Sequence, residues 1–314
     1  MGFTRREFFA AAGAAVAAGG VAAVKKGGVK RIDKNLSVFI ADVHVPKQQW
    51  WSHKFFNRVI DEILAMRPLP ARVVVFGDLA LYWGVKSDYE GSYPYFQRLA
   101  EVGIELTIGM GNHDRRSAFL EVWPEYAKRT LVPGRIVTRT DLGYADLLML
   151  DGLHGSDDRG ERDCGPSRGV LDEAQQEWLL KELASLKRPT FLGSHYPIGD
   201  ISVKGTPLSK LMLQYPMLAG YIHGHVHTAS SHWIGDKKRF MRTLCLPPAS
   251  MDTDLGYVLF KTDPKTAAAK LVMYDFLFPI IGRKDPRPQG WDEIVRDKNG
   301  RVCTFVLPTA DKQA

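Results

Sequence analysis

Residues 36–44 read Leu-Ser-Val-Phe-Ile-Ala-Asp-Val-His, an apolar run that ends in an aspartate and a histidine two positions apart. The run predicts a short strand over Leu36–Ala41, because a brief apolar stretch with β-branched and aromatic side chains favours a buried strand. Four later apolar runs also end in potential metal ligands. Their motifs are Gly77-Asp78, Gly111-Asn112-His113-Asp114, Gly193-Ser194-His195 and Gly224-His225-Val226-His227. The ordered set, more than any single motif, indicates one site built at five strand ends.

The first half of the chain alternates between strand and helix patterns. Apolar residues recur at helical spacing between residues 51 and 63, and a second helix is expected around Phe96 and Leu99. Strands are expected at residues 73–76 and 105–108. Strands that alternate with helices predict an α/β fold with a largely parallel sheet in this part.

The second half predicts two more ligand-bearing strands and then antiparallel hairpins. The strands span residues 190–193 and 218–222, and hairpins are expected at 233–244 and 257–274. Between the two halves, residues 152–169 are rich in Gly, Asp and Arg without an apolar period, which is typical of a functional or disordered loop. A helix is expected to follow, with Asp172 capping it and Gln175 three residues later.

Composition restricts the class of protein. The chain has 314 residues, 45% hydrophobic and 25% charged, which is typical of a soluble globular protein with a sizeable core. The net charge of +7 favours anionic substrates, but no dense Lys/Arg stripe is interleaved with aromatics, so no nucleic-acid partner is expected. The three cysteines are far apart and never form Cys-x-x-Cys, which predicts neither a disulfide framework nor a zinc knuckle.

The N-terminus has the pattern of a targeting signal. Thr4-Arg5-Arg6-Glu7-Phe8-Phe9 precedes an uncharged stretch of Ala, Gly and Val up to Val24, which resembles a twin-arginine translocation signal. That resemblance implies the twin-arginine export machinery as a partner and a periplasmic location. The stretch is short and only mildly apolar for a stable span, although an uncleaved signal would leave a membrane anchor.

Three segments are therefore expected. Residues 1–30 form the signal and a short linker, residues 31–278 form one domain, and residues 279–314 form a charged, proline-containing appendage. Within the appendage, Asp297-Lys298-Asn299-Gly300 predicts a hairpin turn between residues 294–295 and 302–307.

The spacing of the motif residues suits a shared site. In a strand, residues two apart point to the same side, so Asp42 and His44 are expected to reach one point together, as are His225 and His227. In open α/β sheets, ligands collect at the carboxyl ends of the strands, where all these residues fall.

This order of motifs, over residues 36–275, resembles that of the calcineurin-like metallophosphoesterase superfamily. The resemblance implies a four-layer α/β/β/α sandwich of two mixed sheets flanked by helices. It also implies hydrolysis of phosphomonoesters or phosphodiesters by a hydroxide held between two metal ions. Carried onto this sequence, it assigns one ion to Asp42, His44, Asp78 and His227, and the other to Asp78, Asn112, His195 and His225. It makes His113 the general acid and Asp114 the residue that orients the His113 ring.

The residue types agree with such a centre. Imidazole, carboxylate and amide ligands together suit Mn, Fe or Zn, as divalent or mixed-valence ions, better than Ca²⁺, which prefers oxygen alone. Two divalent ions against the carboxylates of Asp42 and Asp78 leave a charge of about +2, which would attract a small anionic phosphoester. Two such ions can also activate a shared water.

Some positions depart from subgroups of the superfamily. Leu81 stands where many members have a second aspartate, and Tyr82 is one residue late for the metal-binding tyrosine of purple acid phosphatases. His223 is expected to be packed or to support a ligand, and His154 opens the long loop.

Alternatives remain open at this point. A non-catalytic metal-binding or scaffold protein on the same fold is the rival to an enzyme, and a nuclease would need a broader basic groove. Substrate identity and the choice between monoester and diester lie in loops such as 152–169.

Overall fold

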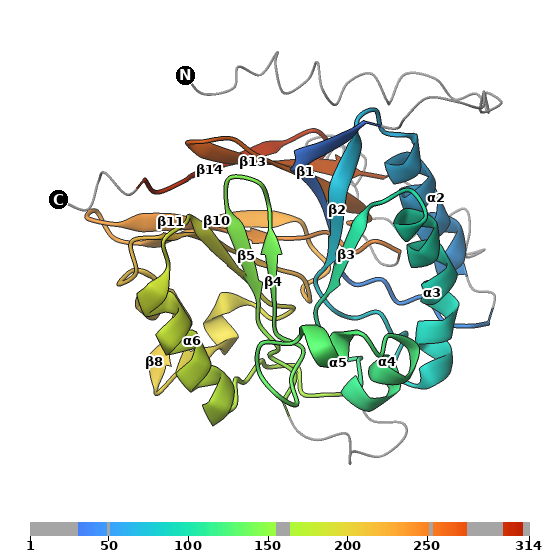
Figure 1. Ribbon diagram of the computed structural model, residues 1–314, viewed down its shortest axis with the longest axis horizontal. Helices are drawn as coiled ribbons and strands as arrows, with labels where there is room; N and C mark the ends of the chain where they lie inside the picture. The colour runs from blue at the N-terminus through green and yellow to red at the C-terminus, as the bar shows by residue number, and fades with distance from the viewer. Residues whose placement is uncertain (1–30, 49–50, 155–163, 251–253, 275–297, 310–314) are drawn as a thin grey trace, which may run out of the picture.

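A computed structural model of the chain describes residues 31–48, 51–154, 164–250, 254–274 and 298–309. Two six-stranded mixed sheets pack face to face, and helices cover their outer faces (Figure 1). The expected α/β sandwich of two mixed sheets flanked by helices is confirmed.

The first sheet combines parallel strands from the start of the chain with antiparallel strands from its end. Its strand order is β14 (Val302–Val306), β13 (Thr266–Met273), β12 (Gly256–Thr262), β1 (Ile32–Ile40), β2 (Leu69–Val75) and β3 (Glu105–Ile108). Strands β1, β2 and β3 are mutually parallel because α2 (Trp51–Ala65) and α3 (Lys86–Ala100) carry the chain back between them.

The second sheet has four parallel strands at its centre and an antiparallel strand at each edge. Its order is β10 (Ser230–Gly235), β11 (Phe240–Cys245), β9 (Leu218–His223), β6 (Thr190–Gly193), β5 (Asp146–Met149) and β4 (Thr138–Asp141). Helix α6 (Glu173–Ser185) precedes β6 and begins as the sequence predicts, with the Asp172 carboxylate accepting a hydrogen bond of 2.9 Å from the backbone of Gln175. Smaller elements are α4 (Arg116–Val122), α5 (Tyr126–Arg129), η2 (Ile198–Asp200), β7 (Ser202–Val203), β8 (Thr206–Pro207) and α7 (Leu208–Met212).

Three apolar layers hold the sandwich together. One lies between the first sheet and α2 and α3, one lies between the two sheets, and one lies between the second sheet and α6 and α7. The layer between the sheets is centred on buried phenylalanines: Phe39 stacks on Phe260 with centroids 4.5 Å apart, and Phe191 meets Phe305 edge-on at 5.2 Å. Each buried phenylalanine stabilises the fold by about 1.5–3 kcal/mol, so the strand ends project from a rigid base.

The second strand of the hairpin expected in the C-terminal segment, at 302–307, is present as Val302–Val306. Val302–Val306 pairs antiparallel with β13 as β14, because alternate residues Cys303 and Phe305 can be buried in the layer between the sheets. The first strand of the expected hairpin, at 294–295, lies outside the described residues.

Two other expectations fall partly or wholly outside the described ranges. These are the export signal within residues 1–30 and the middle of the long loop, 155–163. Of the helices that the described ranges contain, none has the length and apolar character needed to cross a bilayer.

Candidate metal centre

The five motifs meet where the loops after β1, β2, β3, β6 and β9 come together. Backbone hydrogen bonds join the loops directly: the amide of Val43 donates to the carbonyl of Asp78 at 2.8 Å, and the amide of Gly224 donates to the carbonyl of His195 at 3.0 Å. Gly111 is required here because a Cβ at this position would lie 2.1 Å from Oδ1 of Asp78. The loops are therefore packed as one unit around the motif residues.

Most of the motif ligands have a left-handed backbone. The φ angles are 51° at Asp42, 45° at His44, 52° at Asp78, 71° at His225 and 54° at His227. Only one other described non-glycine residue, Lys204, has a positive φ. Such a conformation costs about 1–2 kcal/mol per residue and is typical of functional sites.

This backbone corrects one expectation from the sequence. The ligands lie beyond the strand ends, so strand parity does not decide where they point. His225 and His227, expected to reach one point together, belong to two different clusters. Asp42 and His44 do share a cluster.

The first cluster contains Asp42, His44 and His227, whose ligand atoms lie within 4.8 Å of one another. Nδ1 of His44 is 2.9 Å from the carbonyl oxygen of Ala80, so this nitrogen carries the proton and donates it. Burial lowers the pKa of His44 to about 4, which keeps the ring neutral. Its Nε2 is buried without a hydrogen-bond partner among the described residues and lies 3.7 Å from Oδ2 of Asp78. A neutral imidazole nitrogen that faces a carboxylate in this way has the arrangement of a metal ligand.

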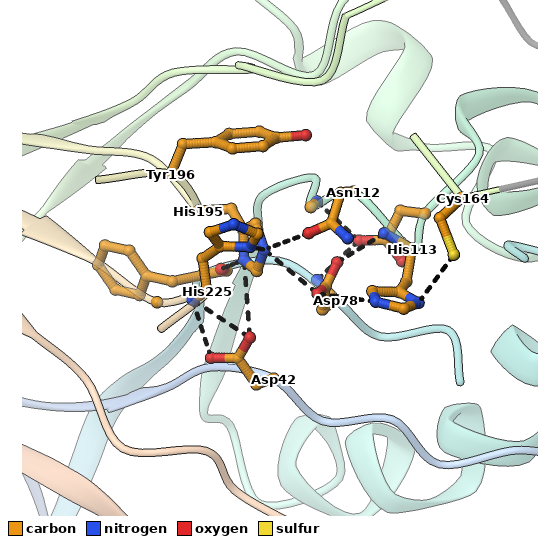
Figure 2. A network of polar contacts seen from close by, with 12 residues as sticks. Asp42, Asp78, Asn112, His113, Cys164, His195, Tyr196 and His225 are labelled. Carbon is orange, nitrogen blue, oxygen red and sulfur yellow. Dashed lines mark hydrogen bonds and ion pairs between the residues drawn. The ribbon is translucent and has the colours of Figure 1, made fainter. Parts of the chain in front are cut away.

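The second cluster contains Asp78, His195 and His225. Figure 2 shows Asn112 converging on the same point. Nε2 of His195 lies 3.2 Å from Oδ2 of Asp78, 3.0 Å from Oδ1 of Asn112 and 3.1 Å from Nδ1 of His225. Nδ1 of His195 lies 2.9 Å from the carbonyl oxygen of Phe76, which fixes the orientation of the ring.

The four closely spaced donor atoms of Asp78, Asn112, His195 and His225 require a positive charge among them. Burial opposes a charged His195, but the carboxylates of Asp78 and Asp42 and the Phe76 carbonyl together outweigh burial and raise the pKa of His195 to about 9. Burial would likewise raise the pKa of Asp78, yet the charge of His195 and its hydrogen bond to the carboxylate hold it well below its usual range. A proton on His195 satisfies only one pair of atoms, whereas a divalent cation can bind all four donors at once. The donor set of the two clusters therefore fits metal ions, with Oδ2 of Asp78 between them.

His113 lies beside the clusters and belongs to neither. Its Nε2 is 4.0 Å from Oδ2 of Asp78, its ring meets that of His44 edge-on at 4.9 Å, and its side chain is 22% exposed. Nδ1 lies 2.9 Å from the carbonyl oxygen of Tyr82. The Tyr82 carbonyl thus holds Nδ1 of His113, while Nε2 faces the clusters.

Asp114 makes contacts that differ from the expected ring-orienting role. Its Oδ2 accepts hydrogen bonds from the amides of Asp78 (2.8 Å) and Gly111 (2.9 Å). Its Oδ1 accepts from the amides of Leu79 and Ala80, both at 3.1 Å, and from the Tyr89 hydroxyl at 3.2 Å. Asp114 fixes the loop that carries Asp78, because one carboxylate can satisfy several amides that a left-handed turn leaves unpaired.

Two residues near the site, Cys164 and Tyr196, escaped the sequence analysis. The thiol of Cys164 donates to the Tyr82 carbonyl at 3.0 Å and lies 3.6 Å from Nδ1 of His113. Tyr196 packs its ring against His195 and His225, and its buried hydroxyl has no hydrogen-bond partner in the described part of the chain. Only adjacency to a motif, as Tyr196 follows His195, could have indicated such a residue.

The remaining histidines are outside both clusters. Nδ1 of His223 lies 2.9 Å from the carbonyl oxygen of Gly224, and burial lowers the pKa of His223 to about 4. His154 is exposed at the start of the long loop. The candidate centre thus comprises the seven motif ligands, with His113 and Tyr196 at its border.

Comparison with known proteins agrees with this arrangement. The model of a family described as calcineurin-like phosphoesterase matches residues 37–229. No curated protein matches the sequence. Among solved structures, a dimetal phosphatase from Danio rerio is similar with a TM-score of 0.57 and 13% identity, over 75% of this chain and 95% of that one. Vps29 from Chaetomium thermophilum has a TM-score of 0.39 and 12% identity, over 89% and 98%. At such identity, the first likeness concerns the fold alone.

Proposed function

The chain belongs to the calcineurin-like phosphoesterase family, and from that premise we propose that it hydrolyses phosphomonoesters or phosphodiesters with two metal ions. The observation that carries the proposal is the position of Asp78. Its Oδ2 lies between Nε2 of His44, at 3.7 Å, which has no hydrogen-bond partner among the described residues, and Nε2 of His195, at 3.2 Å. A carboxylate between two sets of imidazole ligands is the arrangement that a pair of neighbouring cations requires.

Each ion would have three ligands of its own, and one further ligand would be shared. Asp42, His44 and His227 would hold one, the side chains of Asn112, His195 and His225 would hold the other, and Asp78 would contact both. When bound, such a pair lowers the pKa of water and neutralises the charge that develops on the phosphoryl oxygens. Since the site supplies only two carboxylates, divalent ions leave it positive and attractive to a phosphate group.

His113 would donate a proton to the leaving group. Its Nδ1–H donates to the Tyr82 carbonyl, which leaves Nε2 as the nitrogen that faces the clusters. After Nε2 gives up its proton, the same carbonyl holds the neutral ring in the Nδ1–H tautomer. The partly exposed side chain allows water to return the proton.

The test combines metal analysis with two substrates, a p-nitrophenyl monoester and a bis-p-nitrophenyl diester, before and after chelation. We expect chelator-sensitive cleavage of at least one of them. His195→Ala should lose both metal and cleavage, whereas His232→Ala, which removes an exposed histidine on β10, should keep both. Metal binding without cleavage of either substrate would favour the scaffold alternative.

A further inference from the structure

Two large aromatic side chains stand exposed beside the proton donor. Tyr82 is 44% exposed and Trp83 is 37% exposed, in the loop that follows Asp78. Their rings are 5.8 Å apart, and the Tyr82 ring is 6.4 Å from the imidazole of His113. These distances fall in the range at which aromatic rings interact.

The loop that carries these rings is firmly held. The Tyr82 carbonyl accepts from His113, and the Trp83 carbonyl accepts from Nε of Arg115 at 2.9 Å. Gly84, in the same loop, packs so closely on the backbone of residues 114–115 that a Cβ would lie 2.6 Å from the amide nitrogen of Arg115. The Leu81 amide donates to Asp88 at 3.2 Å. Exposed rings on a rigid loop form a preorganised binding surface, which loses little entropy when a ligand docks.

The position of these rings relative to His113 determines what they can contact. If His113 protonates the departing oxygen, that oxygen lies within hydrogen-bonding distance of Nε2. The atoms attached to it then extend from the imidazole toward its neighbours, and Tyr82 is the aromatic neighbour on the exposed side. The phosphoryl group itself stays with the metal ligands.

We propose that Tyr82 and Trp83 form a stacking platform for a planar aromatic ring in the leaving group. The substrate class is accordingly a phosphoester of an aryl-bearing alcohol or of a nucleoside. This inference rests on the proposed function, because it uses His113 as the proton donor.

The test compares leaving groups with and without an aromatic ring. Benzyl phosphate and cyclohexylmethyl phosphate form one pair, and adenosine 5′-monophosphate and ribose 5-phosphate form the other. Methyl diesters of the same alcohols replace them if the enzyme prefers diesters. Base–aromatic stacking predicts a kcat/KM preference of about tenfold for the aromatic member of at least one pair. A preference in the first pair points to an aryl alcohol, and a preference in the second pair points to a nucleobase.

Variants locate the platform. Tyr82→Ala and Trp83→Ala should each reduce the preference at least threefold, while Tyr82→Phe should keep it. The backbone carbonyl of Tyr82 is retained in all of these. Tyr144→Ala is the matched control, since Tyr144 is also 44% exposed but lies in the turn between β4 and β5.

A readout on the unmodified protein covers variants that fail to fold. Benzylphosphonate should inhibit about tenfold more strongly than cyclohexylmethylphosphonate. Hydrolysis with less than a twofold preference in both pairs, and equal inhibition by the two phosphonates, would overturn the platform while leaving the proposed function intact. Absence of metal-dependent hydrolysis of every ester would instead overturn the proposed function.

Discussion

Replacing Asp114 by Asn should destabilise the metal-ligand loop while leaving the size of the side chain unchanged. Each carboxylate oxygen of Asp114 accepts at least two buried backbone amides: those of Asp78 and Gly111 on Oδ2, and those of Leu79 and Ala80 on Oδ1. An Asn side chain has one oxygen and one NH₂ group. Whichever way the Asn side chain is turned, two backbone N–H groups therefore lose their acceptor.

The magnitude follows from those two amides. A buried donor left unsatisfied costs about 1–3 kcal/mol, so Asp114→Asn should cost about 2–6 kcal/mol. Total stabilities are about 5–15 kcal/mol, which makes this a large fraction. The loop cannot relax easily, because Gly77 and Asp78 already have φ angles of 85° and 52°.

Thermal unfolding of chelator-treated protein measures this cost without a contribution from metal binding. We expect the melting temperature to fall by about 3 °C or more, and metal affinity to fall as well. Asp236→Asn is the control, since Oδ1 of this exposed aspartate accepts both the Lys238 and Arg239 amides and an Asn oxygen can replace it. A melting temperature for Asp114→Asn that matches the Asp236→Asn value would contradict the proposed role of Asp114.

Three further outcomes are expected. His113→Ala should retain its metal but lose about 10²–10⁴-fold in turnover of alkyl esters, and less with p-nitrophenyl esters, whose leaving group needs no proton; equal losses would remove its role as the acid. Burial raises the pKa of Asp88 to about 6, above its value in the unfolded chain, so stability from its protonated form is lost as the pH rises from about 4 to 6. The melting temperature of Asp88→Asn minus that of the parent should therefore be larger at pH 7.5 than at pH 4.5. A difference that stays the same at both pH values would contradict this. Tyr196→Phe removes a buried hydroxyl that has no hydrogen-bond partner among the described residues, so it should not lower the free energy of unfolding. A decrease in that free energy of more than about 1 kcal/mol would show that the hydroxyl is hydrogen-bonded.

Much of the fold could be predicted from the sequence because its strands are short apolar runs with clear ends. The runs at 105–108 and 190–193 form strands with those bounds, and the Asp172 cap is a local interaction between residues three apart. The strand expected at 302–307 forms as β14 (Val302–Val306), but its pairing with β13 in the first sheet was not predicted, because that pairing is long-range.

The candidate site was predictable in its members and less so in its geometry. Asp42 and His44 meet because hydrogen bonds from their loop to Asp78 impose left-handed backbone angles. Those bonds join residues far apart in sequence, so no local pattern reveals them. For the same reason the sequence did not show that Asp114 binds the 78–80 amides or that the Tyr82 carbonyl anchors His113.

The most direct measurement is anomalous X-ray diffraction from crystals of the purified protein after reconstitution with Mn²⁺ or Zn²⁺. We expect two ions per chain, one among Asp42, His44 and His227 and one among Asp78, His195 and His225, with Asp78 touching both. A single ion, or ions bound away from these residues, would contradict the two-metal centre.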